Sequence, residues 1–375
     1  MNVKEQEKYS LVIIGAGPAG LSMAITVLQA MDISVLIVEG KGKNRPRIGE
    51  SCPPELVILM AQLGTLESFK NAGHHPSPGY SSVWGRADIG HNDSIVSPLG
   101  PNWCLDREKF DEMLEERAES LKGNISWNTR FIQMNQEENG DFQIDLKDED
   151  SGQLRKVFAH FVVDASGVKA RAVKALGVHK KVEDTLFAHI RFAEIIEGKM
   201  SKRVQLEATN KGWWYQASLP RNNVVSMMIT HQNQIKELQR DESKAFDKAL
   251  AKTSFIAAES KKVKLTNCTY RTWPVYSGIL DKIEGENWLA IGDAAASYDP
   301  IMARGIYKGL SDGIKGANKV LSFFRQDGKY DHGSFSSHVQ KNFKQYRKNR
   351  LLTYAIERRW LNDQFWKDRL AGYDQ

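Results

Sequence analysis

Hydrophobic residues occur along this chain in two distinct patterns. Short, mainly apolar runs occur at residues 11–14, 33–38, 156–163 and 287–291. Such runs are typical of parallel strands that are buried on both faces. From about residue 185 to 276, β-rich segments alternate apolar and polar positions, which predicts a mostly antiparallel sheet. The sequence therefore predicts an α/β protein with a Rossmann-like nucleotide-binding domain, a second sheet domain and a helical C-terminal tail.

The glycine-rich turn after the first strand predicts a dinucleotide site. Gly15 permits a tight turn, Gly17 lets a pyrophosphate approach the backbone, and Gly20 lets helix and strand pack closely. The helix that begins here offers free N–H groups and the positive end of its dipole. The second strand ends in Glu39, whose carboxylate can accept hydrogen bonds from ribose hydroxyls. The cofactor contacts predicted in this unit are Gly15, Gly17, Pro18, Ala19, Gly20 and Glu39.

A polar loop that contains glycine and proline follows the second strand at residues 45–54. It lies close enough in sequence to the glycine turn to fold over a bound cofactor. Arg47 has the charge to pair with a phosphate, and Glu50 and Ser51 can bond a sugar or a ribityl chain. The alternative interpretation is a plain surface loop that precedes a helix at residues 55–66.

A second basic candidate lies at the start of a later helix. Asp106 is a suitable N-cap residue, so Arg107 falls in the first turn. The helix dipole disfavours a cation at this place, which suggests that Arg107 acts on a phosphate or a ribityl group. The alternative is an arginine that is simply solvated.

Two later strands also end in an aspartate that small residues follow. The strand at residues 156–163 leads into a turn that either brings backbone against a ligand or is purely structural. Asp293, after the strand at 287–291, can bond a ribityl hydroxyl. A helix that begins near Gly305 can stabilise negative charge on a reduced isoalloxazine ring. The contacts predicted at the two turns are Asp164, Ala165, Gly167, Gly292 and Asp293.

Composition excludes several classes of protein. Lys and Arg outnumber Asp and Glu by 52 to 46, an excess too small and too dispersed to indicate nucleic acid. The N-terminus lacks an apolar signal segment, and no apolar run approaches the length of a membrane span. The three cysteines are scattered and indicate neither a disulfide framework nor a metal site, so a reducing cytoplasm is expected. A chain of 375 residues is expected to form about two domains.

The predicted second sheet carries an aromatic cluster at residues 213–215, which can line a pocket or pack within the sheet. Residues 80–84 are predicted to form a short strand, residues 90–100 an irregular segment and residues 236–258 a helix. The tail beyond residue 335 is basic and aromatic. We expect it to dock on its own domain, and binding to a partner protein is the alternative.

Taken in this order, the three motifs resemble the FAD monooxygenase superfamily of the p-hydroxybenzoate hydroxylase type, over most of the chain. In that superfamily the first motif holds ADP, the second approaches the pyrophosphate and the Gly-Asp segment holds the ribityl chain. The resemblance implies a discontinuous FAD-binding domain at residues 1–75, 100–182 and 275–334, a substrate domain at 76–99 and 183–274, and a helical segment at 335–375. It also implies FAD contacts at Arg47, Glu50, Ser51 and Arg107, and ring neighbours at Asp299, Pro300, Gly305 and Ile306.

The segments Gly49-Glu50-Ser51 and Asp299-Pro300 are similar to the branch that includes the tryptophan halogenases. Two features of halogenases are missing, because Tyr215 and Ala217 stand where their WxWxIP pattern has tryptophans, and residues 74–78 contain no lysine. The compact length and the loop at residues 47–54 instead resemble the LodB/GoxB-type flavoproteins. Members of that family are maturation partners of lysine ε-oxidase and glycine oxidase, whose cysteine tryptophylquinone forms from their own side chains.

This resemblance implies an FAD-dependent monooxygenase that uses O2 to hydroxylate a tryptophan of a precursor protein, in the cytoplasm that the cysteine usage predicts. No second glycine motif is visible, so NAD(P)H is expected to bind transiently, or a flavin reductase to supply the electrons. The candidate catalytic residues are Glu50, His189, Arg191 and Trp214. Two alternatives stay open. One is a small-molecule aromatic hydroxylase, a halogenase-like enzyme or a geranylgeranyl-reductase-like flavoprotein, and the other is a non-catalytic maturation chaperone.

Overall fold

The computed structural model describes residues 7–43, 47–94, 97–325 and 333–371. A seven-stranded sheet forms the first layer, in the order β8-β2-β1-β11-β10-β9, with β19 also paired to β11. The pairs β8-β2, β2-β1, β1-β11 and β11-β19 are parallel, whereas β9 and β10 add an antiparallel hairpin. The strands are β1 Glu7–Ile14, β2 Val35–Val38, β8 Asn124–Ser126, β9 Thr129–Gln136, β10 Phe142–Asp148, β11 Leu154–Asp164 and β19 Trp288–Ala290.

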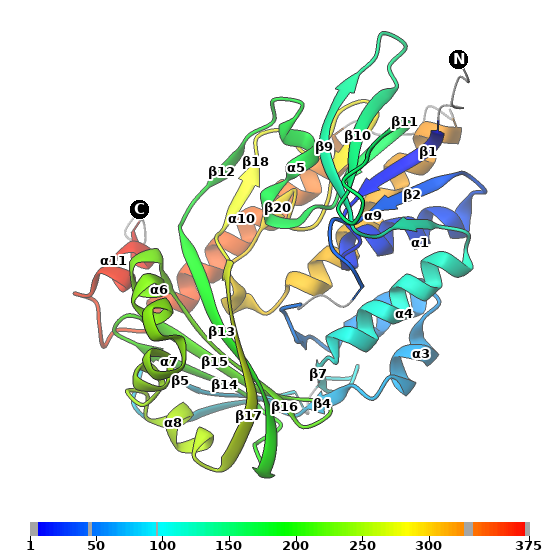
Figure 1. Cartoon of the computed structure of the whole chain (residues 1–375). Helices are drawn as coiled ribbons and strands as arrows, with labels where there is room; N and C mark the ends of the chain where they lie inside the picture. Colours follow the sequence, from blue (N-terminus) through cyan, green and yellow to red (C-terminus); the bar gives the residue numbers. More distant parts are fainter. Residues whose placement is uncertain (1–6, 44–46, 95–96, 326–332, 372–375) are drawn as a thin grey trace.

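Two long helices, α1 (Pro18–Ala30) and α9 (Gly305–Arg325), pack side by side against this sheet (Figure 1). Their backbones approach closely because α9 carries glycine at the contact. A Cβ on Gly313 would lie 2.1 Å from Ser22 Oγ and 2.5 Å from the Ala19 carbonyl oxygen. Helix α4 (Arg107–Ser120) also packs on α1. This packing fixes the N-terminal ends of α1 and α9 relative to each other.

A second seven-stranded sheet has the order β17-β13-β16-β15-β14-β5-β6 and is antiparallel except for the β14-β5 pair. The mixed α/β fold with a mostly antiparallel second sheet is therefore confirmed. Strand β6 corrects one expectation, because residues 90–93 pair with β5 within the segment predicted to be irregular. The strands are β5 Gly79–Val83, β6 Gly90–Asp93, β13 Leu186–Gly198, β14 Val204–Thr209, β15 Gly212–Leu219, β16 Asn223–His231 and β17 Val263–Pro274.

One face of this second sheet is covered by α6 (Gln232–Leu238), α7 (Glu242–Leu250) and α8 (Phe255–Ser260) (Figure 1). A single helix was expected at residues 236–258, and the structure shows three short ones. The buried carboxylate of Glu207 on β14 explains the last break. It accepts hydrogen bonds from the backbone N–H groups of Ser254, Phe255 and Ile256 at 2.6–2.9 Å, and so begins a new helix there.

The helical tail, α10 (Ser334–Ala355) and α11 (Gln364–Leu370), docks on its own chain as expected. Tyr354 and Trp366 are fully buried. The indole N–H of Trp366 donates to the Thr209 carbonyl oxygen at 2.9 Å, and that of Trp84 donates to the Thr353 carbonyl oxygen at 2.9 Å. These contacts join the tail to strand β14 and to Trp84, which directly follows β5.

The remaining short elements connect the two layers. The helix expected at residues 55–66 ends early, because Gly64 adopts a positive φ of 69° between α2 and α3.

Within the described ranges, no helix is long and apolar enough to cross a membrane. The remaining bounds are β3 Ser51–Cys52, α2 Leu56–Gln62, α3 Leu66–Asn71, β4 His75–Ser77, β7 Asn102–Cys104, α5 Arg171–Lys174, β12 Lys180–Val182, β18 Gly278–Leu280 and β20 Ala296–Ser297.

Candidate functional site

The glycine turn between β1 and α1 packs directly on the turn that follows β11. A Cβ on Gly15, which has a φ of +116°, would lie 2.3 Å from the Ala165 carbonyl oxygen. A Cβ on Gly20 would lie 2.0 Å from the Gly15 carbonyl oxygen. In contrast, a Cβ on Gly17 would meet nothing within 4 Å, so the N-terminus of α1 faces open space. The first two predicted motifs therefore lie together in space.

Glu39 lies at the end of β2, beside this turn. Its carboxylate accepts hydrogen bonds from the backbone N–H of Ala16 at 3.2 Å and of Lys41 at 3.1 Å. The side chain thus reaches the glycine turn, where the ribose of a bound dinucleotide is expected.

Asp164 holds its own turn together. The carboxylate is fully buried and accepts hydrogen bonds from Ser166 N at 2.9 Å, Ala172 N at 2.8 Å and Val173 N at 2.9 Å. These bonds favour the structural interpretation of the Asp164 side chain. The backbone of the same turn, at Ala165, packs against Gly15.

The Gly292–Asp293 segment joins the same cluster. A Cβ on Gly292 would lie 2.8 Å from the Cβ of Ala19 on α1. Two lysines that the sequence did not single out hold the segment by its backbone. Buried Lys308 donates to the Gly292 carbonyl oxygen at 2.9 Å, and Lys180 donates to the Asp293 carbonyl oxygen. Burial lowers the pKa of Lys180 to about 8, and the nearby Asp293 opposes that shift.

These residues fit a bound FAD. The N-termini of α1 and α9 both face open space, since a Cβ on Gly17 or Gly305 would meet nothing within 4 Å. Helix N-termini of this kind hold phosphates and stabilise negative charge. Asp293, whose side chain is exposed, and Glu39 are carboxylates that can accept hydrogen bonds from hydroxyl groups, and their contacts with FAD stay predictions.

Arg47 and Arg107 fasten the loop of residues 47–52 to α4. Arg47 forms ion pairs with Asp111 at 2.5 Å and with Glu115 at 2.9 Å. Arg107 donates to the carbonyl oxygens of Ile48 and Gly49 and also pairs with Asp111 at 2.9 Å. Both guanidinium groups are therefore engaged within the protein, and their contacts with a phosphate or ribityl group stay predictions.

The same loop places Glu50 and Ser51 between the two layers. Glu50 is 2% exposed, and burial raises the pKa of its carboxyl group to about 7, against the opposing charge of Arg107. The Ser51 hydroxyl lies 2.8 Å from the Tyr215 hydroxyl on β15, within hydrogen-bond distance. A Cβ on Gly49 would lie 3.5 Å from Ile306 Cδ1, so the loop adjoins the start of α9.

Replacing Tyr215 with phenylalanine is expected to lower the free energy of unfolding by about 1 kcal/mol, because the Ser51 contact is lost. Chemical denaturation measures this change. Tyr80→Phe is the matched control, since no hydrogen bond of the Tyr80 hydroxyl is found among the described residues. Equal losses in the two variants would show that the Ser51–Tyr215 bond contributes nothing.

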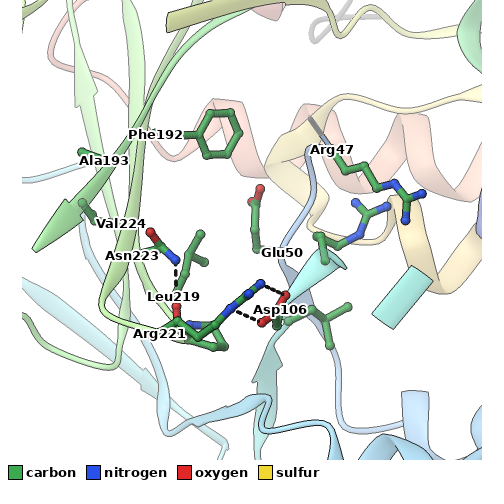
Figure 2. A pocket seen from close by; sticks show the side chains of 12 residues that line it. Arg47, Glu50, Asp106, Phe192, Ala193, Leu219, Arg221, Asn223 and Val224 are labelled. Carbon is green, nitrogen blue, oxygen red and sulfur yellow. Dashed lines mark hydrogen bonds and ion pairs between the residues drawn. The ribbon is translucent and has the colours of Figure 1, made fainter. Parts of the chain in front are cut away.

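A pocket of about 150 Å³ opens beside Glu50. Figure 2 shows the Glu50 side chain pointing toward Phe192 and, below it, Arg221 bonded to Asp106. The Arg221–Asp106 ion pair, at 2.8 Å, joins the β15–β16 turn to the start of α4. The lining residues are Arg47, Glu50, Leu105, Asp106, Arg107, Phe192, Ala193, Leu219, Pro220, Arg221, Asn223 and Val224.

His189, Arg191 and Trp214 are not brought together with Glu50. Trp214 packs on Phe246 with ring centroids 5.1 Å apart, and Arg191 lies over the same ring and pairs with Asp247 at 2.8 Å. His189 Nδ1 lies 2.9 Å from Thr272 Oγ1. Because side chains alternate along a strand, these three residues face α7, whereas Tyr215 faces the loop of Glu50. The structure thus places these three candidate catalytic side chains in the helix-covered core, away from Glu50.

His189→Ala is expected to lower the free energy of unfolding by roughly 1–3 kcal/mol while leaving flavin absorbance and turnover unchanged. The physical reason is that the imidazole is buried against α7 and contacts neither the loop of Glu50 nor the pocket. Denaturation and visible absorbance measure the two effects. A large loss of turnover in a fully folded variant would contradict this placement.

Asp299 connects the segment before α9 to the tail and to the second sheet. Its carboxyl group is 1% exposed and accepts a hydrogen bond from Tyr354 Oη at 2.8 Å, and burial raises its pKa to about 6. Tyr354 in turn accepts a hydrogen bond from Trp213 Nε1 at 2.9 Å. The Tyr346 hydroxyl accepts one from Asp299 N at 2.8 Å. No local sequence signal identifies Tyr346 and Tyr354, because their partners are distant in the chain. Pro300 begins the short 3-10 helix that follows.

A family model described as "FAD binding domain" matches residues 8–339. The chain belongs to this family. It is therefore an FAD-dependent oxidoreductase, in a family that includes monooxygenases. The match spans all three glycine-containing motifs, so this family membership and the clustered motifs agree.

Several relatives match over nearly the whole chain. LodB of Marinomonas mediterranea, named as an FAD-dependent oxidoreductase, is 25% identical over 366 residues, which cover 97% of this chain and 98% of LodB. A pyrrole-2-carbonyl carrier-protein brominase of Pseudoalteromonas luteoviolacea is 25% identical over 332 residues, 85% of this chain and 78% of the brominase. The LodB/GoxB-type resemblance is thus confirmed at the level of a FAD-dependent oxidoreductase of the LodB and halogenase family.

Solved structures show the same fold. The myxobacterial chondrochloren halogenase CndH superposes with a TM-score of 0.85 at 19% identity, covering 97% of this chain and 86% of CndH. The peptidyl tryptophan dihydroxylase QhpG, described as essential for tryptophylquinone cofactor biogenesis, gives a TM-score of 0.74 at 18% identity, over 96% of this chain and 78% of QhpG.

Proposed function

We propose that this chain is a monooxygenase that hydroxylates a tryptophan of a precursor protein during cysteine tryptophylquinone biogenesis in an amino-acid oxidase. The observation that carries the proposal is the match to LodB over 97% of this chain and 98% of LodB. The shared fold of a peptidyl tryptophan dihydroxylase supports the same chemistry. The further partners in this proposal are O2 and either NAD(P)H or a flavin reductase.

Residues 74–78, the stretch in which a halogenase has its lysine, favour oxygenation over halogenation as the reaction of this chain. His74 is buried, and its Nδ1 accepts a hydrogen bond from Asp106 N at 3.1 Å, so this stretch packs in the core beside α4. Lys70, the nearest lysine upstream, pairs with Glu67 on the exposed side of α3. No lysine of residues 70–78 is therefore directed toward the pocket of Glu50.

Bound FAD would supply the redox chemistry, activating O2 once two electrons have reached the ring. The chain's own residues would bind FAD and orient it. We expect the N–H groups at the start of α1 to hold the pyrophosphate, Asp293 to bond the ribityl chain, and the N-terminus of α9 to stabilise negative charge on the ring. The apolar side chains of Phe192, Leu219 and Val224 line the pocket beside Glu50.

The proposal is tested by intact mass and peptide mapping of the oxidase precursor, expressed with and without this chain. We expect oxygen on one tryptophan only when this chain is present. Asp293→Ala and Gly17→Val are expected to abolish that modification through loss of FAD, whereas Glu138→Gln, in an exposed turn, is expected to retain it. An unmodified precursor would contradict the proposal and direct attention to small-molecule substrates.

A further inference from the structure

The pocket beside Glu50 runs from the surface to a buried carboxyl group. At its outer end the Arg221 side chain is 54% exposed, and at its inner end Glu50 is 2% exposed. Phe192, Leu219 and Val224 form apolar walls between the two. Figure 2 shows Glu50 extending into this space. The pocket therefore joins solvent to one acidic side chain.

The Glu50 carboxyl group is poorly satisfied in this position. Within the described part of the chain, its Oε1 atom is buried and has no hydrogen-bond partner. A buried oxygen atom without a hydrogen-bond partner destabilises the folded state, unless a ligand, a water molecule or a bound proton satisfies it.

The groups that face Glu50 come from four elements: Arg107 on α4, Cys52 on β3, Cys104 on β7 and Tyr215 on β15. Burial raises the pKa of both thiols to about 12 and that of Tyr215 well above its ordinary value, so these three stay neutral. Arg107 is held by Asp111 and by the loop carbonyl groups. Glu50 is thus the group of this set that can exchange a proton near neutral pH. The other charged residues that line the pocket are Arg47, Asp106 and Arg221.

The proposed reaction requires protons at a buried place. Each oxygenation of a C–H bond takes one O2, two electrons and two protons, and it yields a C–OH group and one water molecule. A reduced nicotinamide or a reduced flavin supplies the electrons. The oxygen atom that is not transferred leaves as water only if a proton reaches it. The loop that carries Glu50 lies close to the expected position of the flavin ring, because Gly49 adjoins Ile306 at the start of α9.

We propose that Glu50 is the proton carrier of this site and that the pocket under Arg221 is its route to solvent. This inference rests on the proposed monooxygenase function. The Glu50 carboxyl group gives its proton to the departing oxygen atom, and it takes another from water that enters the pocket. Proton delivery by a positioned carboxyl group of this kind is general acid catalysis.

The Arg221 side chain lies at the opening of the pocket to solvent. It lies at the tip of the β15–β16 turn with a positive φ of 58°, and it reaches across to Asp106 at 2.8 Å and to Glu108 at 2.7 Å. The contacts join the second sheet to α4 across the opening. Arg221→Ala is expected to widen the opening, to admit more water to Glu50, and to shift the titration of Glu50 toward the ordinary value of a glutamate.

The first test uses the flavin-free chain and the infrared band of its protonated carboxyl groups. The wild-type difference spectrum is expected to contain a carboxyl that titrates near pH 7 and is missing from Glu50→Gln. Arg221→Ala is expected to lower that midpoint, and the exposed control Glu138→Gln to leave it unchanged. A Glu50 carboxyl group that titrates near pH 4.5 would overturn the proposal.

The second test uses the FAD-loaded chain, reduced and then mixed with O2 in the absence of any precursor protein. Without a substrate to oxygenate, O2 takes two electrons and two protons and leaves as hydrogen peroxide, so protons are still required at the same place. Flavin reoxidation in the wild type is expected to slow about tenfold per pH unit above pH 7, while Glu50→Gln is slow and independent of pH. Glu50→Asp is expected to restore the pH dependence in part. An identical pH profile in wild type and Glu50→Gln would overturn the proton route. A normal profile with an unmodified precursor would instead contradict the proposed substrate, so the two failures are distinguishable.

Discussion

Asp164→Ala is expected to lower the free energy of unfolding by roughly 3–6 kcal/mol and to prevent retention of FAD. The buried carboxylate accepts hydrogen bonds from the backbone N–H groups of Ser166, Ala172 and Val173, and all three donors lose their acceptor. The turn that presses on Gly15 then loses its support. Chemical denaturation and visible absorbance of the purified chain measure the two effects.

Asp148→Ala is the matched control for this prediction. Asp148 also accepts backbone hydrogen bonds, from Asp150 N at 3.2 Å and Ser151 N at 2.7 Å, but it does so in an exposed turn. Water can replace the lost acceptor there, so a much smaller change is expected. Similar losses of stability in the two variants would show that burial is not what makes Asp164 important.

The stability of the flavin-free chain is expected to depend on pH through Glu50. Its pKa is about 7 in the folded chain, against an ordinary value of 4.5, so the folded state binds the proton more tightly than the unfolded state. The resulting stabilisation is complete below pH 4.5 and is lost as pH rises through 7. The loss amounts to about 3 kcal/mol, from about 1.4 kcal/mol per pH unit of pKa difference.

Glu50→Gln removes this dependence, because the amide does not titrate. Denaturation of wild type and Glu50→Gln at pH 5 and at pH 8 is expected to show that the variant gains stability relative to wild type at the higher pH. Asp299, whose pKa is about 6, titrates in both proteins and therefore cancels in the comparison. A constant difference between the two proteins across this range would exclude a raised pKa at Glu50.

The features that the sequence predicts well are those encoded by neighbouring residues. The strand, turn and helix around Gly15 and Gly20 follow from local apolar runs and from positions that tolerate no Cβ. The meeting of the glycine turn with the Asp164 and Asp293 turns also follows, because the parallel strands β1, β11 and β19 end at one edge of the sheet.

The features that the sequence does not predict depend on residues whose partners are distant in the chain. Alternation along β13 shows that His189 and Ile190 face opposite sides of the sheet, but not which side α7 will cover. The start of α8 depends on Glu207, which lies 47 residues before Ser254. Likewise, the burial of Glu50 depends on Tyr215 and on the loop's attachment to α4, and no spacing in the sequence records either contact.

The attachment of Asp299 to Tyr354 has a consequence for the order in which the protein matures. Synthesis proceeds from the N-terminus, so the glycine turn, the second sheet and α9 all leave the ribosome before Tyr354 is made. Until then Asp299 lacks the hydroxyl group that donates to its carboxylate, and Trp213 lacks its acceptor. The segment around Asp299, which is expected to adjoin the flavin ring, is therefore completed last. Nascent chains arrested before residue 354 are expected to bind FAD less tightly than the released protein, and this result would couple cofactor loading to the completion of translation.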